Sequence, residues 1–600
     1  MARRVQAPHA PAHRFPGRRL APVHGLPAAR RPGPRQRRDR RGGPGSGPRP
    51  ARGAAPAQRQ RPVPARRRRL GHDPRRRRDR RSRRALGRRA RAARARGRRR
   101  HIHPGVGRPA RPHHLRPGGR ARGARAGRSR ACVVGHGDRT RAQPTRARAP
   151  QRRHRLRRDP RSAARRGRRA GDRDYAHQRS GYIRGGNPGL VLRAHDAQDV
   201  VEGLGFAREQ QARGAWDGAG RLPFSVRSGG HGISGLSTND GGIVLDLKAL
   251  DEVTVLDPAS RRVRIGAGAT WGHVAEALAE HGWGMSSGDF GDVGVGGLAT
   301  AGGIGFMGRK HGLTIDHAVA YDVVLADGTL VHATADEHPD LFWGMRGAGG
   351  GLGIVTAVEL EVYEVPPVVL AVMLYDASDA RGLLEAWGTA VEEAPRELTS
   401  FLTLQPGRGE TPGLAQAMTV IASDDVRLAE RALEPLLRVG PVLQQQAQLA
   451  PYAAVVAPQD APHVSDGPGG TFRNTLVDHL DDRTARAAAD AFETGGFQMF
   501  QVRAVGGAVN DLASDATAYA HRDGQQFDVS GVGFGHPGLL DAAWDTAMDP
   551  VAHGEYVSLS TDRRPERIER VYPGATLERL RDLKRRYDPE NVFDRNLPLL

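Results

Sequence analysis

Two glycine-rich segments of this 600-residue chain have the composition needed to hold phosphate groups. The first reads RSGGHG at residues 227–232 and lies at the end of an expected strand, 223–227, and the second has seven glycines among residues 291–305. Because glycine lets successive backbone N–H groups approach an anion closely, both segments predict a nest for a diphosphate. A tight structural turn is the alternative for the first segment alone. In the second, so many glycines require a close backbone approach to offset their conformational cost.

Neither segment matches the common nucleotide-binding loops. A Rossmann unit needs GxGxxG between a strand and a helix, and a P-loop needs GxxxxGK[ST], so both folds are disfavoured. The single cysteine, Cys132, lies outside the glycine-rich part of the chain. We therefore expect neither a disulfide framework nor a metal site.

The elements around these segments predict an α+β protein. Residues 189–196 and 223–227 are expected to be strands on either side of a helix at 197–211, which gives a βαβ-like opening. Further strands are expected at 242–247, in a hairpin at 253–268 and within 318–334 and 353–365, with a helix near 270–282.

The pair Pro366 and Pro367 marks the expected end of a first ordered domain, 171–366. Helical and β-rich pieces alternate in residues 367–555, which predicts an antiparallel sheet with helices on one face. A last segment, 556–600, contains a helix ending near residue 587 and an irregular tail.

The composition of residues 1–170 differs from that of the rest. They hold 58 of the 94 basic side chains, all arginine, and five of the 64 acidic ones. High charge with low hydrophobicity predicts a disordered segment, because too little apolar surface offsets the entropy of ordering. Its Arg, Pro, Ala and Gly are typical of GC-rich DNA translated in a wrong frame or from an over-extended start, which is the origin we expect. A real disordered tail or a nucleic-acid-binding arm, through Arg66–Arg69 and Arg75–Arg78, is the alternative.

Four blocks, in this order, resemble the PCMH-type FAD-binding domain and C-terminal region of the vanillyl-alcohol-oxidase superfamily, in its berberine-bridge-enzyme-like branch. They read RSGGHG at 227–232, VGVGGLATAGGIGFMGRKHG at 293–312, PDLFWGMRGAGGGLGIVT at 339–356 and RLRDLKRRYDPENVF at 579–593. The resemblance covers nearly all of residues 171–600. It implies a two-subdomain FAD-binding domain at 171–366, a substrate domain, and a C-terminal segment that returns to the FAD-binding domain.

The resemblance also assigns cofactor roles. It implies that His231 bonds covalently to the flavin, and that Val295 lies near the reactive ring carbon, where a small side chain leaves room for oxygen. The position of the cysteine that makes a second link in many relatives is Phe290 here, so a single histidyl link is expected. The other residues expected to bind FAD are Arg227, Ser228, Gly229, Gly230, Gly232, Gly294, Gly296, Gly297, Thr300, Gly302, Gly303, Ile354 and Val355.

Relatives often take the catalytic base from a tyrosine in a YxN-type strand. Here the expected strand is 556–559, with Ser558 in place of the asparagine, and Tyr556 is the leading candidate. A phenol needs a nearby charge or hydrogen bonds to act as a base near neutral pH. Asp528 and Tyr519 are the other candidates, and the sequence does not rank them.

The resulting hypothesis is an FAD-dependent oxidase of a small molecule, with O2 as electron acceptor. It would take a hydride from an alcohol, amine or related carbon. A nucleic-acid-binding protein and a flavin-binding protein without catalysis are the alternatives. The N-terminus has no signal-peptide pattern and no run of 18 apolar residues occurs, so a cytoplasmic protein with no membrane partner is expected.

Overall fold

The computed structural model describes residues 184–214, 221–407, 411–458, 469–494, 496–595 and 598–600, together with residues 175, 179, 181 and 182. Every described residue lies within the unit 144–600 of the chain. The segment 1–170, predicted to be disordered, therefore lies outside the described residues.

A three-stranded parallel sheet opens the described part of the chain, in the order β1-β3-β2. The helix that follows the first strand begins where Asp196 caps it, because the Asp196 carboxylate accepts a hydrogen bond of 2.8 Å from the N–H of Asp199. The predicted βαβ-like opening is confirmed. Its elements are β1 (Leu190–Arg193), α4 (Ala197–Ala212), β2 (Phe224–Arg227) and β3 (Ile243–Asp246).

A five-stranded antiparallel sheet follows, in the order β4-β5-β9-β7-β8. Helix α4 contacts both β3 and this second sheet, so it packs between the two. The sheet consists of β4 (Val253–Asp257), β5 (Arg262–Gly266), β7 (Ala318–Val324), β8 (Leu330–Thr334) and β9 (Ile354–Glu361). The helices associated with it are α5 (Trp271–Ala279) and α8 (Pro339–Ala348).

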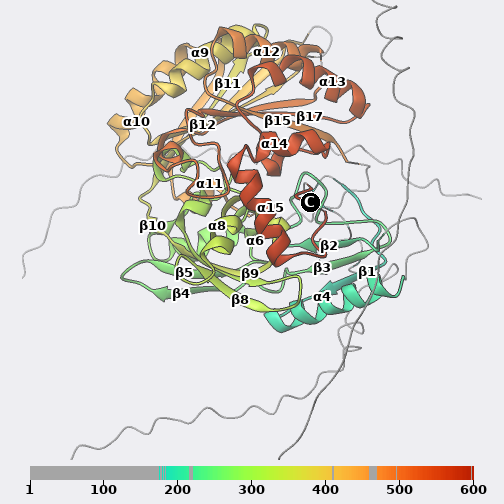
Figure 1. The fold of residues 1–600 in the computed structure, drawn as a ribbon. Helices are drawn as coiled ribbons and strands as arrows, with labels where there is room; N and C mark the ends of the chain where they lie inside the picture. Colours follow the sequence, from blue (N-terminus) through green and yellow to red (C-terminus); the bar gives the residue numbers. More distant parts are fainter. Residues whose placement is uncertain are drawn as a thin grey trace, which may run out of the picture. The chain divides into compact units, whose positions relative to one another are not determined.

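Seven antiparallel strands form the largest sheet, in the order β14-β11-β13-β12-β16-β17-β15. They are β11 (Val368–Asp376), β12 (Leu398–Gln405), β13 (Leu414–Ile421), β14 (Val442–Ala450), β15 (Thr471–Val477), β16 (Met499–Ala504) and β17 (Phe527–Gly533). Helices cover one face of this sheet, as Figure 1 shows, and this confirms the predicted α+β class. They are α9 (Ala380–Glu392), α10 (Val426–Leu433), α12 (Asp482–Thr494) and α13 (Pro537–Ala547).

Strand alternation gives this sheet two different faces. Leu402, Val502 and Phe527 pack in the core beneath the helices. The alternate residues point the other way, where Phe401 stacks on Phe306, from the second glycine-rich segment, with ring centroids 4.5 Å apart. The sheet therefore contacts the predicted cofactor-binding part of the chain on the face that the helices leave open.

The C-terminal segment returns to the first half of the chain. Figure 1 shows the last long helix, α15 (Ala575–Tyr587), beside α8, and the two are in contact. The Lys584 ammonium fixes this return by donating to the carbonyl of Gly351, at 2.9 Å, and to the carboxylate of Asp588, at 2.6 Å. Between α13 and α15 lie the short helices η6 (Asp549–Val551), η7 (Val557–Leu559), η8 (Pro565–Arg567) and α14 (Ile568–Val571).

The prediction of a strand at 556–559 was wrong. Tyr556 has an extended backbone, but Val557–Leu559 form the 3-10 helix η7, closed by a hydrogen bond of 3.2 Å from the N–H of Leu559 to the carbonyl of Tyr556. The strand-like pairing ends at Gly554, which bridges Leu476 of β15. Beyond Gly554, the Asn474 side chain donates to the carbonyl of Tyr556 and accepts from its N–H. These two bonds take the place of the backbone hydrogen bonds of a paired strand.

The remaining elements are short. They are β6 (Trp283–Gly284), α6 (Val295–Leu298), α7 (Gly308–His311), η2 (Thr314–His317), η3 (Gly349–Gly351), β10 (Tyr363–Glu364), η4 (Pro435–Arg438), α11 (Tyr452–Val455) and η5 (Gly507–Asp511). Among the described helices, none combines the length and apolar character needed to cross a bilayer.

Candidate active site

The two glycine-rich segments meet backbone to backbone. A Cβ atom on Gly229, just after β2, would overlap the backbone N of Gly294, and one on Gly294 would overlap the N of Gly229 and the hydroxyl of Ser228. Ser228 joins the contact by donating a hydrogen bond of 2.6 Å to the carbonyl of Ala267. Only glycine permits this approach at both positions, so the two clusters form one structural feature.

His231 lies at the edge of this feature between two aromatic rings. Its imidazole stacks on Tyr182, with ring centroids 4.5 Å apart and an interplanar angle of 16°. Phe290 has its ring centroid 5.8 Å from that of the imidazole. The ring of His231 is therefore held in one orientation beside the glycine segments.

The backbone around His231 has donors suited to phosphate oxygens. No oxygen of the described residues accepts a hydrogen bond from the N–H groups of Gly229, Gly230, Gly232 or Gly297. Among the described residues, no atom outside the neighbouring residues and the backbone of α6 lies within 4 Å of the position that a Cβ on Gly297 would take. Amides that donate to no oxygen of the described residues, beside an imidazole, fit the diphosphate and ring of a flavin dinucleotide.

Arg227 contributes the charged group of the first cluster. Its guanidinium contacts the backbone of Gly230, where a Cβ would stand 3.0 Å from Nε. Burial lowers the pKa of Arg227, and the nearby carboxylate of Asp246 opposes that effect. A cation placed at a nest of amide donors strengthens the preference for an anion.

Thr300 connects the second cluster to the glycines of the third block. Its carbonyl accepts hydrogen bonds from the N–H groups of Gly347 (3.1 Å) and Gly349 (3.2 Å), and its hydroxyl donates to the carbonyl of Gly296 (2.8 Å). Val295 is fully buried in α6. The predicted FAD-binding residues Ile354 and Val355 begin β9 and pair with Val324 and Val323 of β7.

Tyr556 lies directly on the second glycine cluster. Its phenol oxygen accepts a hydrogen bond of 3.1 Å from the N–H of Gly303, and its ring atoms stand about 3 Å from the position of a Cβ on Gly302. Gly303 has φ +89°, a conformation that favours glycine. Asn474 of β15 fixes the Tyr556 backbone through hydrogen bonds of 2.7 and 2.8 Å.

Burial raises the pKa of Tyr556, although the hydrogen bonds from Gly303 and Ser558 lower it in part. The phenol therefore keeps its proton at neutral pH. It can accept a proton from a substrate only while it releases its own.

Asp528 belongs to a buried ion-pair cluster near Tyr556. Arg503 of β16 donates to Asp528, at 3.1 Å, and also to Asp289, at 3.3 Å, which directly precedes Phe290. The second carboxylate oxygen of Asp528, Oδ1, is buried and has no hydrogen-bond partner among the described residues. Burial raises the pKa of Asp528, Arg503 opposes the shift, and the cluster holds two carboxylates for one guanidinium.

Tyr519, the third candidate base, lies against Tyr556 with ring centroids 6.1 Å apart. Its hydroxyl donates a hydrogen bond of 2.7 Å to Gln525, and burial raises its pKa far above the ordinary value. The structure thus brings all three candidates together, but the Tyr519 hydroxyl already donates its proton in a hydrogen bond to Gln525.

Three residues of this site were not singled out in the sequence. Tyr182 stacks on His231, Asn474 positions Tyr556, and Arg503 joins the two carboxylates. Arg503 and Asp528 lie directly opposite each other on the neighbouring strands β16 and β17, a pairing that the sequence alone does not reveal. Nothing in the sequence places Tyr182 or Asn474 at the site.

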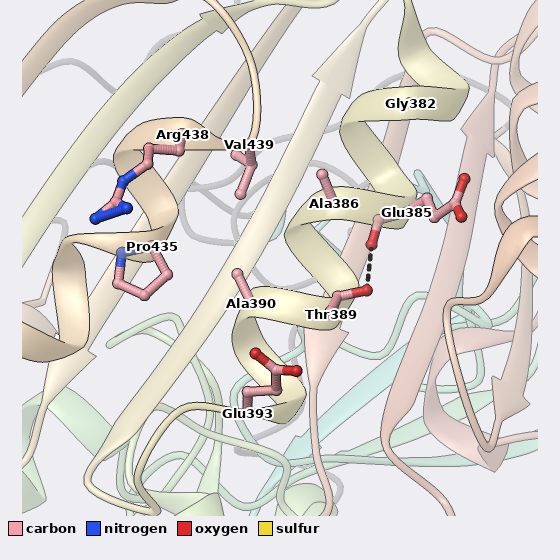
Figure 2. Close-up of a pocket in the computed structure, with 9 residues that line it drawn as sticks. All are labelled: Gly382, Glu385, Ala386, Thr389, Ala390, Glu393, Pro435, Arg438 and Val439. Carbon is pink, nitrogen blue, oxygen red and sulfur yellow. Dashed lines mark hydrogen bonds between the residues drawn. The ribbon is translucent and has the colours of Figure 1, made fainter.

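A separate surface depression, drawn in Figure 2, lies between α9 and η4. Its charged groups come from Glu385, Glu393 and Arg438, and Thr389 donates a hydrogen bond of 3.0 Å to the carbonyl of Glu385. Helix α9 covers the face of the seven-stranded sheet opposite to Arg503 and Asp528, so this depression is not part of the site. The described residues contain no cluster of His, Cys, Asp and Glu placed to hold a metal ion.

Known protein families match two parts of this chain. The model of the family "FAD binding domain" matches residues 188–334, and that of "Berberine and berberine like" matches residues 560–599. The (R)-6-hydroxynicotine oxidase of Paenarthrobacter nicotinovorans is 30% identical over 431 residues, which cover 68% of this chain and 90% of the relative.

Solved structures give the same result. The structure of 6-hydroxy-D-nicotine oxidase from Arthrobacter nicotinovorans is 27% identical with a TM-score of 0.61, and the match covers 72% of this chain and 97% of that one. Glucooligosaccharide oxidase from Acremonium strictum, whose FAD carries 6-S-cysteinyl and 8α-N1-histidyl links, is 22% identical with a TM-score of 0.61 and shares the fold over 72% of this chain and 97% of that one.

Proposed function

Because this chain belongs to the FAD-linked oxidoreductases of the berberine-bridge-enzyme-like branch of the vanillyl-alcohol-oxidase superfamily, we propose that it is an oxidase of a small organic molecule. Its substrate carries an alcohol, an amine or a related oxidisable carbon, and O2 is the electron acceptor. When bound, FAD supplies the hydride acceptor and the route of electrons to oxygen. The relatives named as oxidases of 6-hydroxynicotine and of xylooligosaccharide support an oxidase and span this range of substrates.

One observation supports the proposal above all. The contact between Gly229 and Gly294 joins two segments whose amide donors have no acceptor among the described residues, and His231 and Tyr556 lie at this joint feature. A phosphate nest, an attachment point and an acid–base group in one place match what a flavin oxidation requires.

We assign the binding of FAD to the residues around that contact. Arg227 and the amides of Ser228, Gly229, Gly230 and Gly232 would hold the diphosphate. The flavin ring would be held by the second segment, through Gly294, Val295, Gly296, Gly297, Thr300, Gly302 and Gly303, and by backbone groups of Ile354 and Val355.

A single covalent link through His231 follows from the neighbouring residues. Stacking on Tyr182 orients the imidazole, which limits the geometries it must sample before attachment. Phe290 provides no thiol for a second bond, unlike the doubly linked flavin of glucooligosaccharide oxidase. Val295 has the small side chain that we associate with access of oxygen to the ring.

Tyr556 is the residue that we assign to proton removal from the substrate. Its phenol keeps its proton at rest, so the transfer requires an acceptor for that proton. Asp528 is close enough to raise the pKa of Tyr556, and its buried Oδ1 has no partner among the described residues. Asp528 therefore orients the substrate hydroxyl or amine, or receives the proton that Tyr556 releases.

The covalent link tests this function first. The purified protein is expected to be yellow, to keep its colour in the acid-precipitated pellet, and to carry the flavin mass on the peptide that contains His231. The His231→Ala variant should lose the colour of the pellet. His281→Ala is the matched control, because His281 also stacks on an aromatic ring, Trp283, but lies outside the site. A colourless wild-type protein that takes up no added FAD would overturn the proposal.

A further inference from the structure

Strand β14 is an edge strand that is exposed on both faces. It ends the order of the seven-stranded sheet, pairs with β11 on one side, and has no strand on its other side within the described part of the chain. Residues 443–449 are all exposed, including Leu443 at 54% and Leu449 at 53%. Its outer row of backbone N–H and C=O groups is therefore available for pairing.

Proteins usually protect such an edge with charges, proline, a short strand or a cover, because an open edge recruits another chain. β14 is nine residues long and reads VLQQQAQLA, with neither a charged residue nor a proline. One bulge interrupts its pairing, between Leu374 and Tyr375 of β11, and leaves Gln444–Leu449 regular. The strand thus has the properties of an interface rather than of a protected edge.

The sequence of β14 also indicates the partner. It is nearly a palindrome about Gln446. In an antiparallel pair centred there, Leu443 faces Leu449 of the other strand, Gln444 faces Gln448, and Gln445 faces Ala447. Each side chain then lies on the same face as the residue opposite it, as an antiparallel ladder requires, and the two leucines form an apolar contact at each end. A symmetric homodimer needs such a self-complementary surface.

We propose that two copies of this chain associate through antiparallel pairing of β14 with β14, about a two-fold axis at Gln446. Pairing joins the two seven-stranded sheets into one continuous sheet and covers the exposed Leu443 and Leu449. The interface lies on the sheet edge and uses none of the residues assigned to the flavin.

Charges introduced at the two-fold axis test this proposal. In a symmetric pair Gln446 faces its own copy, so Gln446→Lys or Gln446→Glu alone places like charges opposite each other, whereas an equimolar mixture of the two variants places opposite charges there. We expect the wild-type holoprotein to be dimeric by light scattering coupled to size exclusion. Each variant alone should dissociate at least tenfold more readily, and the mixture should recover the dimer.

Gln198→Lys, on the exposed surface of α4, is the matched control and should remain dimeric. Circular dichroism and retained flavin colour establish that each variant is folded. A wild-type protein that stays monomeric at its highest soluble concentration overturns the proposal. It is also overturned if both single variants remain as dimeric as the wild type, or if the mixture dissociates as readily as the variants alone.

Discussion

At the scale of single residues, the site depends on how side chains far apart in the sequence hold Tyr556. Gly303 bonds to its phenol and Asn474 to its backbone, so its orientation is fixed before substrate binds. Such preorganisation matters for proton transfer, because the donor and the acceptor must lie within hydrogen-bond reach.

Replacing Tyr556 with phenylalanine removes the proposed acid–base group together with the hydrogen bond that its phenol accepts from Gly303. We expect kcat/KM to fall by roughly 10²- to 10⁴-fold, the usual contribution of a positioned acid–base group, with unchanged flavin content. A substrate is first found by screening amines, alcohols and sugars for peroxide release, and the rate of anaerobic flavin bleaching is then measured. Tyr519→Phe is the control. Its kcat/KM should fall less, because the Tyr519 hydroxyl of the wild type is hydrogen-bonded to Gln525. A larger loss in Tyr519→Phe would reverse the assignment.

Glu555, next to Tyr556, is a second residue with an unusual environment. It is 2% exposed, and both carboxylate oxygens are buried without a hydrogen-bond partner among the described residues. Arg567 and Arg473 lie 3.8 and 4.0 Å from it, yet burial outweighs their charge and raises the pKa of Glu555 to about 7. The Glu555 carboxyl group therefore holds its proton to a higher pH in the folded protein than in the unfolded chain.

This shift predicts a pH-dependent stability. A raised pKa means that the folded state binds the proton more tightly than the unfolded state. The contribution of Glu555 to the free energy of unfolding is therefore complete below pH 4.5, approximately, and is lost as the pH rises through about 7. At high pH the free energy of unfolding of Glu555→Gln should therefore exceed that of the wild type by roughly 3 kcal/mol, and at low pH by much less. Urea unfolding of the holoprotein at acidic and alkaline pH measures the difference. Glu566→Gln, at an exposed position, is the control and should show no such dependence.

At the scale of elements, two segments more than sixty residues apart form one site because each has a glycine where the two backbones touch. The turn after β2 and the start of α6 are in backbone contact at Gly229 and Gly294. A side chain at either position forces the segments apart, whereas α6 has open space beside Gly297. Steric packing and cofactor binding can therefore be tested separately.

Gly294→Ala is expected to destabilise the protein itself, by roughly 1–3 kcal/mol, as overpacking does. Gly297→Ala creates no overlap and adds helix propensity, so the stability of the apoprotein should be unchanged or higher. If FAD binds where we place it, Gly297→Ala should nevertheless lower the ratio of flavin to protein absorbance. An unchanged ratio would remove Gly297 from the cofactor site.

At the scale of the whole molecule, the described residues supply every part of the proposed site. Contacts that cross from the seven-stranded sheet to the glycine segments, such as Arg503 with Asp289 and Tyr556 with Gly303, join the catalytic and cofactor-binding parts. None of the assigned residues lies in the arginine-rich segment 1–170.

A protein that begins at residue 171 should therefore keep its flavin and its peroxide-forming activity. The competing hypothesis of a nucleic-acid-binding arm predicts lost function on the same truncation, because that segment holds most of the basic charge. Flavin absorbance and peroxide release, compared with the full chain, decide between the two. A colourless truncated protein would show that the segment contributes to the fold or to the cofactor site.

The sequence by itself determined the local features. Hydrophobic periodicity and capping located β1, α4, the β4–β5 hairpin and α5, because these signals arise between neighbouring residues. The glycine clusters and His231 were likewise visible, since a close backbone approach requires a particular residue type at each position.

Only the tertiary structure decided how the parts meet. Tyr556 reaches Gly303 across 253 positions, and Arg503 reaches Asp289 across 214. Side chains brought together over such separations leave no periodic pattern in the sequence. The same reason explains the wrong strand at 556–559, because Asn474, a residue of another strand, sets the local conformation.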